Sequence, residues 1–183
     1  MSSHHLPFFN SRILPFLSLG ALALASICFT PKATAAQDEK GAGITVGADA
    51  DAKDIGLPLY PGSRRHKDKD EDSPGVNFGL WGGGSGFKLA VLKLESDDSP
   101  DKIADFYKKK LSQYGKVLDC SNPSPANSGK DDKSNMLTCG DDKAEKGGMV
   151  FKSGTKEKQH LVAIQPNGHG SLFQLVYLAH WDK

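Results

Sequence analysis

Residues 87–115 read FKLAVLKLESDDSPDKIADFYKKKLSQYG and join a strand pattern to a helix pattern. Over 87–94, Phe87, Leu89 and Val91 alternate with their neighbours, which is the two-residue period of a β-strand. From residue 99 onward the apolar residues recur at the three- and four-residue spacing of an α-helix. This change of period predicts a domain that combines a sheet with a helix.

The helix is expected to run from Ser99 to Gly115 and to be amphipathic. Ser99 is a favoured N-cap, and Pro100 suits the first helical position, where an N–H has no partner within the helix. Gly115 is a typical C-cap. One face carries the apolar side chains that we expect to be buried, namely Ile103, Phe106, Tyr107, Leu111 and Tyr114.

The rest of the chain supplies further strand segments separated by turn formers. The segments with strand character lie at 76–81, 117–120, 136–139, 148–152, 160–165 and 172–181. The glycine-rich residues 82–86 are expected to form a long hairpin loop, and 63–75 and 121–134 to form exposed loops. The sequence therefore predicts an α+β domain, in which one amphipathic helix packs on an antiparallel sheet of about six or seven strands.

The N-terminal 35 residues have the pattern of a secretory signal peptide. Arg12 precedes an apolar run at 13–29, Pro31 follows it, and Ala35 and Ala36 mark the expected cleavage site. Export to the periplasm or the extracellular space follows, with a membrane as partner only if the segment is retained as an anchor. Lipidation of Cys28 is disfavoured because Ile27 stands where a small residue is required.

We divide the mature chain into a flexible linker and one domain. Residues 36–54 are small and acidic, with few large apolar side chains, and are expected to stay flexible. Residues 55–183 are expected to form the single α+β domain. Cleavage lowers the count of basic residues from 23 to 21 against 22 acidic residues, so the net charge is near −1. A balance so close to neutral argues against nucleic acid as a partner.

Two of the three cysteines, Cys120 and Cys139, remain in the mature chain. An even number of cysteines in an exported protein predicts a disulfide bond, with two free buried thiols as the alternative. Their wide spacing does not fit a redox-active pair, in which two residues separate the cysteines. We therefore expect a single structural disulfide.

Two motifs carry a family resemblance. The segment LPLYPG at 57–62 predicts a turn at Pro61 and Gly62, and it is followed by DSPDKI at 98–103 with Phe106, Tyr107 and Leu111 further on. In this order the chain resembles uncharacterised exported bacterial domains of the acidobacterial type, over residues 56 to about 180. The resemblance implies export and an α+β fold and carries no activity.

Other motifs do not fit the chemistry that they suggest. The residues Asp68, Asp70 and Asp72 begin like a calcium loop, but the required glycine and glutamate are missing. The loop 82–86 precedes a strand, whereas a phosphate-binding loop opens a helix. The histidines have no metal-ligand spacing and are expected at the surface: His66, His160, His169 and His180. We expect neither a metal nor another cofactor.

Aromatic side chains are the best candidates for ligand binding. Trp81 lies beside the glycine hairpin, and Tyr177 and Trp181 lie near the C-terminus. Exposed aromatic rings on a sheet stack on sugars or hold a peptide, and the alternative is that they fill the core. The sequence favours a non-enzymatic exported domain that binds an envelope protein or a small ligand. The alternative is an exported hydrolase with a site that no motif reveals.

Mass spectrometry of the secreted protein tests the predicted signal peptide. Because cleavage is expected after Ala35 or Ala36, the mature chain should begin at Ala36 or Gln37. A secreted protein that still carries Met1 would contradict cleavage and indicate an anchor.

Overall fold

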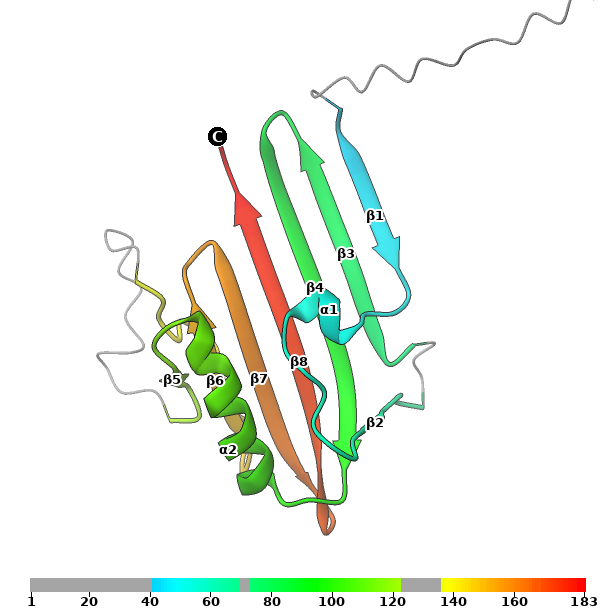
Figure 1. The fold of residues 1–183 in the computed structure, drawn as a ribbon, viewed down its shortest axis with the longest axis vertical. Coiled ribbons are helices and arrows are strands. Elements are labelled where there is room, and N and C mark those ends of the chain that lie inside the picture. Colours follow the sequence, from blue (N-terminus) through cyan, green and yellow to red (C-terminus); the bar gives the residue numbers. More distant parts are fainter. Residues whose placement is uncertain (1–40, 70–72, 123–135) are drawn as a thin grey trace, which may run out of the picture. The chain divides into compact units, whose positions relative to one another are not determined.

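Eight strands form one antiparallel sheet in a computed structural model, which describes residues 41–69, 73–122 and 136–183 (Figure 1). The signal segment 1–35, its cleavage site at Ala35 and Ala36, and most of the predicted loop 121–134 lie outside these residues. The elements in chain order are β1 (Gly43–Gly47), α1 (Ala52–Ile55), β2 (Arg64–Arg65), β3 (Gly75–Gly82), β4 (Ser85–Ser96), α2 (Pro100–Leu111), the 3-10 turn η1 (Ser112–Tyr114), β5 (Leu118–Asp119), β6 (Met149–Gly154), β7 (Lys158–Asn167) and β8 (Gly170–Trp181).

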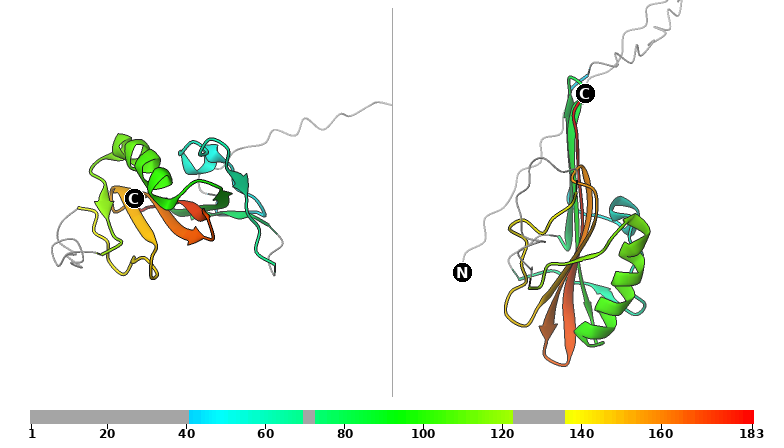
Figure 2. Two further views of the ribbon diagram at one scale, coloured as in Figure 1. Left: turned by 90° about the horizontal axis from the view of Figure 1, so that it is seen from below. Right: turned by 90° about the vertical axis from the view of Figure 1, so that its left-hand side faces the viewer.

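The strand order is β1-β3-β4-β8-β7-β6-β5, and β2 pairs with the far end of β4. The α+β fold, the antiparallel sheet and one main helix therefore agree with the sequence prediction. Figure 2 shows α1 and α2 on the same side of the sheet. From α2, Ile103, Tyr107 and Leu111 are buried in one cluster with sheet residues such as Val162 and Phe173. Phe106 and Tyr114 are only partly buried at the margin of this cluster.

The predicted linker over 36–54 is wrong in its C-terminal half. Residues 43–47 form β1, which pairs with β3, and Ala50 is buried in the core. Ile44 and Val46 alternate with small residues, which is a strand pattern, but the segment is too short and too glycine-rich to predict a strand from its composition. The domain therefore begins before residue 55.

Two loop regions also differ from the prediction. Within 63–75, Arg64 and Arg65 pair with β4 as the short strand β2. Residues 136–139 do not form the returning strand, because β5 already occupies the edge of β6: Leu118 pairs with Lys152 and Asp119 with Phe151. Hydrogen bonding along the sheet, and not the local sequence, decides which segment fills this edge.

The glycine loop between β3 and β4 is shorter than predicted. Gly82 pairs with Ser85, so only Gly83 and Gly84 turn the chain. Both have positive φ, 62° and 96°, which favours glycine and allows the tight hairpin turn that matches the strand twist. The register of β3 against β4 is therefore fixed at this end.

The helix ends one turn earlier than expected. Leu111 closes α2, η1 follows, and Gly115 with φ of 129° lies after η1. The 3-10 turn carries Tyr114 away from the axis of α2, and its hydroxyl donates to the carbonyl oxygen of Gly56. Tyr107 donates in the same way to Pro58 at 3.1 Å.

The segment 56–63 crosses the sheet beside α2 and contains the predicted turn. Ser63 N donates to the Tyr60 carbonyl at 3.0 Å, and Gly62 has φ of 76°, which confirms a turn at Pro61 and Gly62. The Tyr60 hydroxyl donates to Asp98 at 2.9 Å. The two motifs that carry the family resemblance are thus in direct contact.

The predicted disulfide between Cys120 and Cys139 is present, with Cα atoms 5.5 Å apart. Both cysteines are buried in a second cluster with Leu118 and Val150, against which Leu137 packs. Val150 points away from α2, because its neighbour Phe151 belongs to the first core and side chains alternate along a strand. The disulfide therefore holds the segment around residue 139 against the other face of the sheet.

Replacing both cysteines by alanine should lower the free energy of unfolding by about 3 kcal/mol. The disulfide joins residues 19 positions apart, and the loop that it closes lowers the entropy of the unfolded chain. Urea unfolding of the double variant and of the oxidised wild type measures this difference. Equal midpoints and slopes would contradict a stabilising role for the disulfide.

Candidate functional site

The sheet register places both tryptophans on the face that carries α1 and α2. Gly43 pairs with Trp81, Trp81 with Gly86, and Gly86 with Trp181. Directly paired residues of antiparallel strands point to the same face. Four neighbouring strands therefore present an alternating row of glycine and tryptophan.

Each tryptophan ring lies over the glycine beside it. A Cβ atom built on Gly86 would overlap Cε2, Cζ2 and Cη2 of Trp181, all within 2.7 Å. The same three atoms of Trp81 lie within 3.1 Å of a Cβ built on Gly43. Because three consecutive ring atoms are close to one point above the glycine, the glycine faces the plane of the ring. The opposite face of each ring points outward, and Trp81 and Trp181 are 42% and 43% exposed. We call these two rings the tryptophan platform.

The next two rows on the same face bring lysines and further aromatic rings together. Lys88 and Lys158 both pair with Ala179, one from each side. One row further on, Tyr177 pairs with His160, and His160 pairs with Ser153. Tyr177 is therefore partly buried next to the platform and not within it, whereas the sequence grouped it with the two tryptophans.

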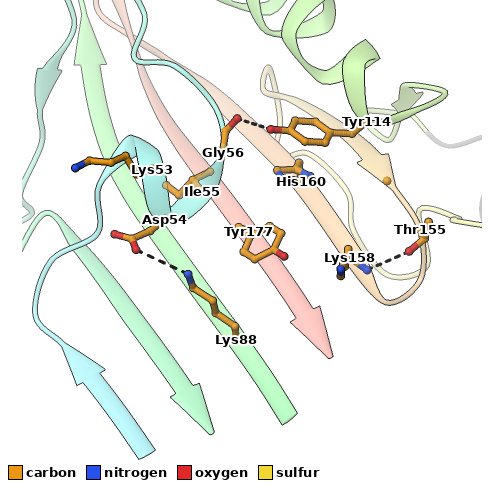
Figure 3. Close-up of a pocket in the computed structure, with 11 residues that line it drawn as sticks. Lys53, Asp54, Ile55, Gly56, Lys88, Tyr114, Thr155, Lys158, His160 and Tyr177 are labelled. Carbon is orange, nitrogen blue, oxygen red and sulfur yellow. Dashed lines mark hydrogen bonds and ion pairs between the residues drawn. The ribbon is translucent and has the colours of Figure 1, made fainter. Parts of the chain in front are cut away.

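A cleft of about 490 Å³ lies above Tyr177, between α1, η1 and the strands β4, β8 and β7 (Figure 3). Such a volume is typical of small-ligand sites. Tyr114 and His160 stack with centroids 3.5 Å apart and form one wall. Lys88 lines this cleft and also a second hollow of about 370 Å³ beside both tryptophans. The complete lining of the cleft is Lys53, Asp54, Ile55, Gly56, Lys88, Tyr114, Gly154, Thr155, Lys158, His160 and Tyr177.

His160 is buried, so the prediction of a surface histidine is wrong for this residue. It is 7% exposed between the rings of Tyr114 and Tyr177. Burial lowers the pKa of His160 to about 4, and a hydrogen bond with the Ile55 backbone opposes this shift. The imidazole is therefore neutral at physiological pH and acts as an aromatic surface.

The neighbouring serine does not make a catalytic pair with this histidine. Ser153 Oγ and His160 Nδ1 are both buried without a hydrogen-bond partner. Ser153 is fully buried, so a substrate cannot reach its hydroxyl. A nucleophile must be within reach of both its base and the substrate, and Ser153 makes no hydrogen bond to His160 and does not line the cleft.

The other histidines considered from the sequence, and Asp68 of the calcium-loop motif, do not line the cleft. His66 bonds to Glu95 at 2.9 Å and to Asp68 at 3.2 Å, which in turn pairs with Lys93 at 2.7 Å. His169 and His180 are exposed. Asp70 and Asp72 lie outside the described residues. In the described ranges, no three His, Cys, Asp or Glu side chains are grouped to hold a metal ion.

The opposite face of the sheet is apolar where the disulfide segment does not cover it. Ile44 and Val46 of β1 are 66% and 73% exposed, and Val76 and Leu80 of β3 are also exposed. The register continues this surface into β4 and β8 through Phe87, Leu89, Val91, Val176 and Leu178. A sheet face in contact with water usually carries polar side chains. This face is exposed and apolar instead, so it is suited to contacts with a partner.

No helix within the described part of the chain combines the length and apolar character needed to cross a membrane.

The buried His160 should make stability depend on pH. Its folded pKa of about 4 lies below the unfolded value of 6.5, so the unfolded state binds the proton first as the pH falls. Neutral His160 therefore contributes to the free energy of unfolding above pH 6.5. This contribution, about 3 kcal/mol in total, is lost as the pH falls towards 4. Urea unfolding between pH 4 and pH 7 should show this dependence in the wild type and not in His160→Gln.

The variant isolates His160 from the other titrating groups. Hydrogen bonds to basic partners lower the pKa of Asp68 and Glu95, and their contribution is common to both proteins. His66 has a raised pKa because of Glu95, which gives the opposite pH dependence, also in both. Identical slopes for the two proteins would show that His160 is not buried in its neutral form.

Comparison with protein-family models, with curated proteins and with solved structures finds no match for this chain. The resemblance to exported bacterial domains therefore stays a prediction, and the function must be argued from the surfaces described above.

Proposed function

We propose that the protein is an exported, non-enzymatic binding domain whose ligand is an oligosaccharide seated on the tryptophan platform. The observation that carries this proposal is that both rings lie flat on glycine with one face turned outward. The glycine removes the side chain that would otherwise tilt the ring. The rings are therefore held in place before a ligand arrives, which lowers the entropy cost of binding.

The chemistry around the rings suits a sugar. A flat aromatic face packs on the C–H side of a pyranose ring and leaves the sugar hydroxyls free for polar partners. Asn77, Thr45 and Lys88 line the same hollow and offer such partners. Trp81 and Trp181 are separated by two inter-strand spacings, about 10 Å, which is longer than one sugar ring. An oligosaccharide is thus a better match than a monosaccharide.

The expected cellular location supports this ligand class. A signal peptide over 1–35 and the disulfide between Cys120 and Cys139 both suit the periplasm or the extracellular space of a bacterium. Polysaccharides are abundant in these compartments.

A hydrolase is the less well supported alternative. Among the described residues of the cleft, Asp54 is the sole carboxylate. Its Oδ1 lies 3.8 Å from Nζ of Lys88. Glycoside hydrolysis uses two carboxyl groups on opposite sides of the bond. Ser153 and His160 are both buried, so the described residues of the cleft offer an aromatic surface for binding and one carboxylate, which is paired with Lys88.

The apolar face favours a second candidate function, contact with a protein partner. Ile44, Val46 and Leu80 are exposed together on this face. The face lies on the opposite side of the sheet from the tryptophan platform, so variants of the two surfaces separate the two functions.

Tryptophan fluorescence provides a direct test, because Trp81 and Trp181 are the two tryptophans of the chain. Titration of the purified, oxidised protein with cellotetraose should change the emission in a saturable way. Trp181→Ala should weaken binding about tenfold, as expected when roughly 1.4 kcal/mol of stacking is lost. Isothermal titration calorimetry measures the same affinities without the tryptophan signal.

Leu80→Ser is the matched control, because Leu80 is next to Trp81 in β3 and points to the opposite face. This variant should bind cellotetraose as the wild type does. If the wild type binds neither cellotetraose nor its acidic counterpart described below, the oligosaccharide proposal is wrong. Partner capture that depends on Leu80 and not on Trp181 would then favour the protein-contact function.

A further inference from the structure

Two lysines flank a small residue immediately beside the tryptophan platform. Lys88 and Lys158 pair with Ala179 from opposite sides, so their Cα atoms are about 10 Å apart. Ala179 is buried and has only a methyl group between them. Both lysines also line the cleft above Tyr177, so both ammonium groups can approach a ligand atom placed between them.

This pair of lysines continues the row on which the tryptophans lie. Lys88 is two residues from Gly86, the glycine under Trp181, and both point to the same face about 7 Å apart. Lys88 also lines both the hollow beside the tryptophans and the cleft above Tyr177. A ligand stacked on Trp181 thus brings its neighbouring substituents to the two lysines.

The positive charge between these side chains is only partly neutralised. Lys88 Nζ lies 3.8 Å from Asp54 Oδ1, which is a long ion pair, and the Lys88 side chain remains 37% exposed. Among the described residues, no ion pair involves Lys158. Of two further carboxylates near the tryptophans, Asp49 is paired with Arg65, and Asp182 lines a hollow beside Trp81 that neither lysine lines. In the cleft, these two lysines therefore face one described carboxylate, Asp54, and a positive charge remains.

We propose that the oligosaccharide is acidic and that one of its carboxylates lies over Ala179 between Lys88 and Lys158. This inference rests on the proposed function and names its substrate class. The stacked sugar ring supplies the binding that all oligosaccharides share, and the lysines supply the preference for a charged one. Because the lysines are at the surface, this preference is electrostatic and weakens as salt is added.

The probes are cellotetraose and β-1,4-linked tetraglucuronate, which share one backbone and differ by a carboxylate at C6 of each sugar. The purified, oxidised wild type should bind tetraglucuronate about five- to tenfold more tightly than cellotetraose at low ionic strength. The ratio should fall towards one at 0.5 M salt. The double variant Lys88→Gln/Lys158→Gln should lose this preference and bind the two probes with equal affinity.

Two controls show whether position matters beyond charge. Lys88→Arg/Lys158→Arg should retain the preference for tetraglucuronate. Lys53 lines the same cleft, but its side chain points away from Tyr177 in Figure 3, so Lys53→Gln should also retain it. A loss in Lys53→Gln equal to the loss in the double variant would overturn the site, because net charge alone would then explain the preference.

The outcomes separate this inference from the proposed function. Equal affinity of the wild type for both probes overturns the acidic ligand and leaves the tryptophan platform in place. A preference that survives in the glutamine double variant, or that does not change with salt, also overturns it. Loss of cellotetraose binding in Trp181→Ala alone supports the platform, whatever the lysine variants show. If the double variant unfolds, the salt dependence in the wild type still decides the inference.

Discussion

The register of β4 against its two neighbours, β3 and β8, is the constraint on which the tryptophan platform depends. Gly83 and Gly84 turn the chain so tightly that Gly82 must pair with Ser85, and this pairing sets Trp81 opposite Gly86. A shift by one residue would move every side chain of β3 to the other face. Trp81 would then join the apolar surface, and its ring would lose the glycine beneath it. The platform thus exists because of the two-residue turn at Gly83 and Gly84.

Tyrosine hydroxyl groups hold the other side of the cleft. Tyr107 bonds to the carbonyl of Pro58, Tyr114 to that of Gly56, and Tyr60 to Asp98. These bonds fasten the segment 56–60 to α2, to η1 and to Asp98 just before α2, which are 38 to 58 residues away along the chain. Tyr114 and the segment together cover His160 and keep it neutral. The cleft wall is therefore aromatic and is held by side-chain hydrogen bonds.

The two faces of the sheet are covered by different segments and over different strands. On one face, α1 and α2 cover the centre and leave the row of tryptophans and lysines open. On the other face, the disulfide segment covers β6 and part of β7, and the apolar side chains of β1 and β3 remain exposed. The oligosaccharide and the partner protein that we propose would therefore occupy opposite faces of the sheet.

Periodicity and cap residues were sufficient to predict the α+β class, the main helix beginning at Pro100 and the strands around 76–94 and 160–181, because these features depend on neighbouring residues. The number of cysteines was sufficient to predict the pairing of Cys120 with Cys139. The position of Trp81 beside a glycine hairpin, and of Trp181 near the C-terminus, also indicated two exposed aromatic rings. The strand β1, the pairing of β5 with β6, and the burial of His160 were not predictable, because each depends on which segment fills a place in the sheet. No local pattern showed that Gly43 and Gly86 lie under the tryptophans, or that Lys88 and Lys158 flank Ala179. These neighbours come from different strands, and only the tertiary register brings them together.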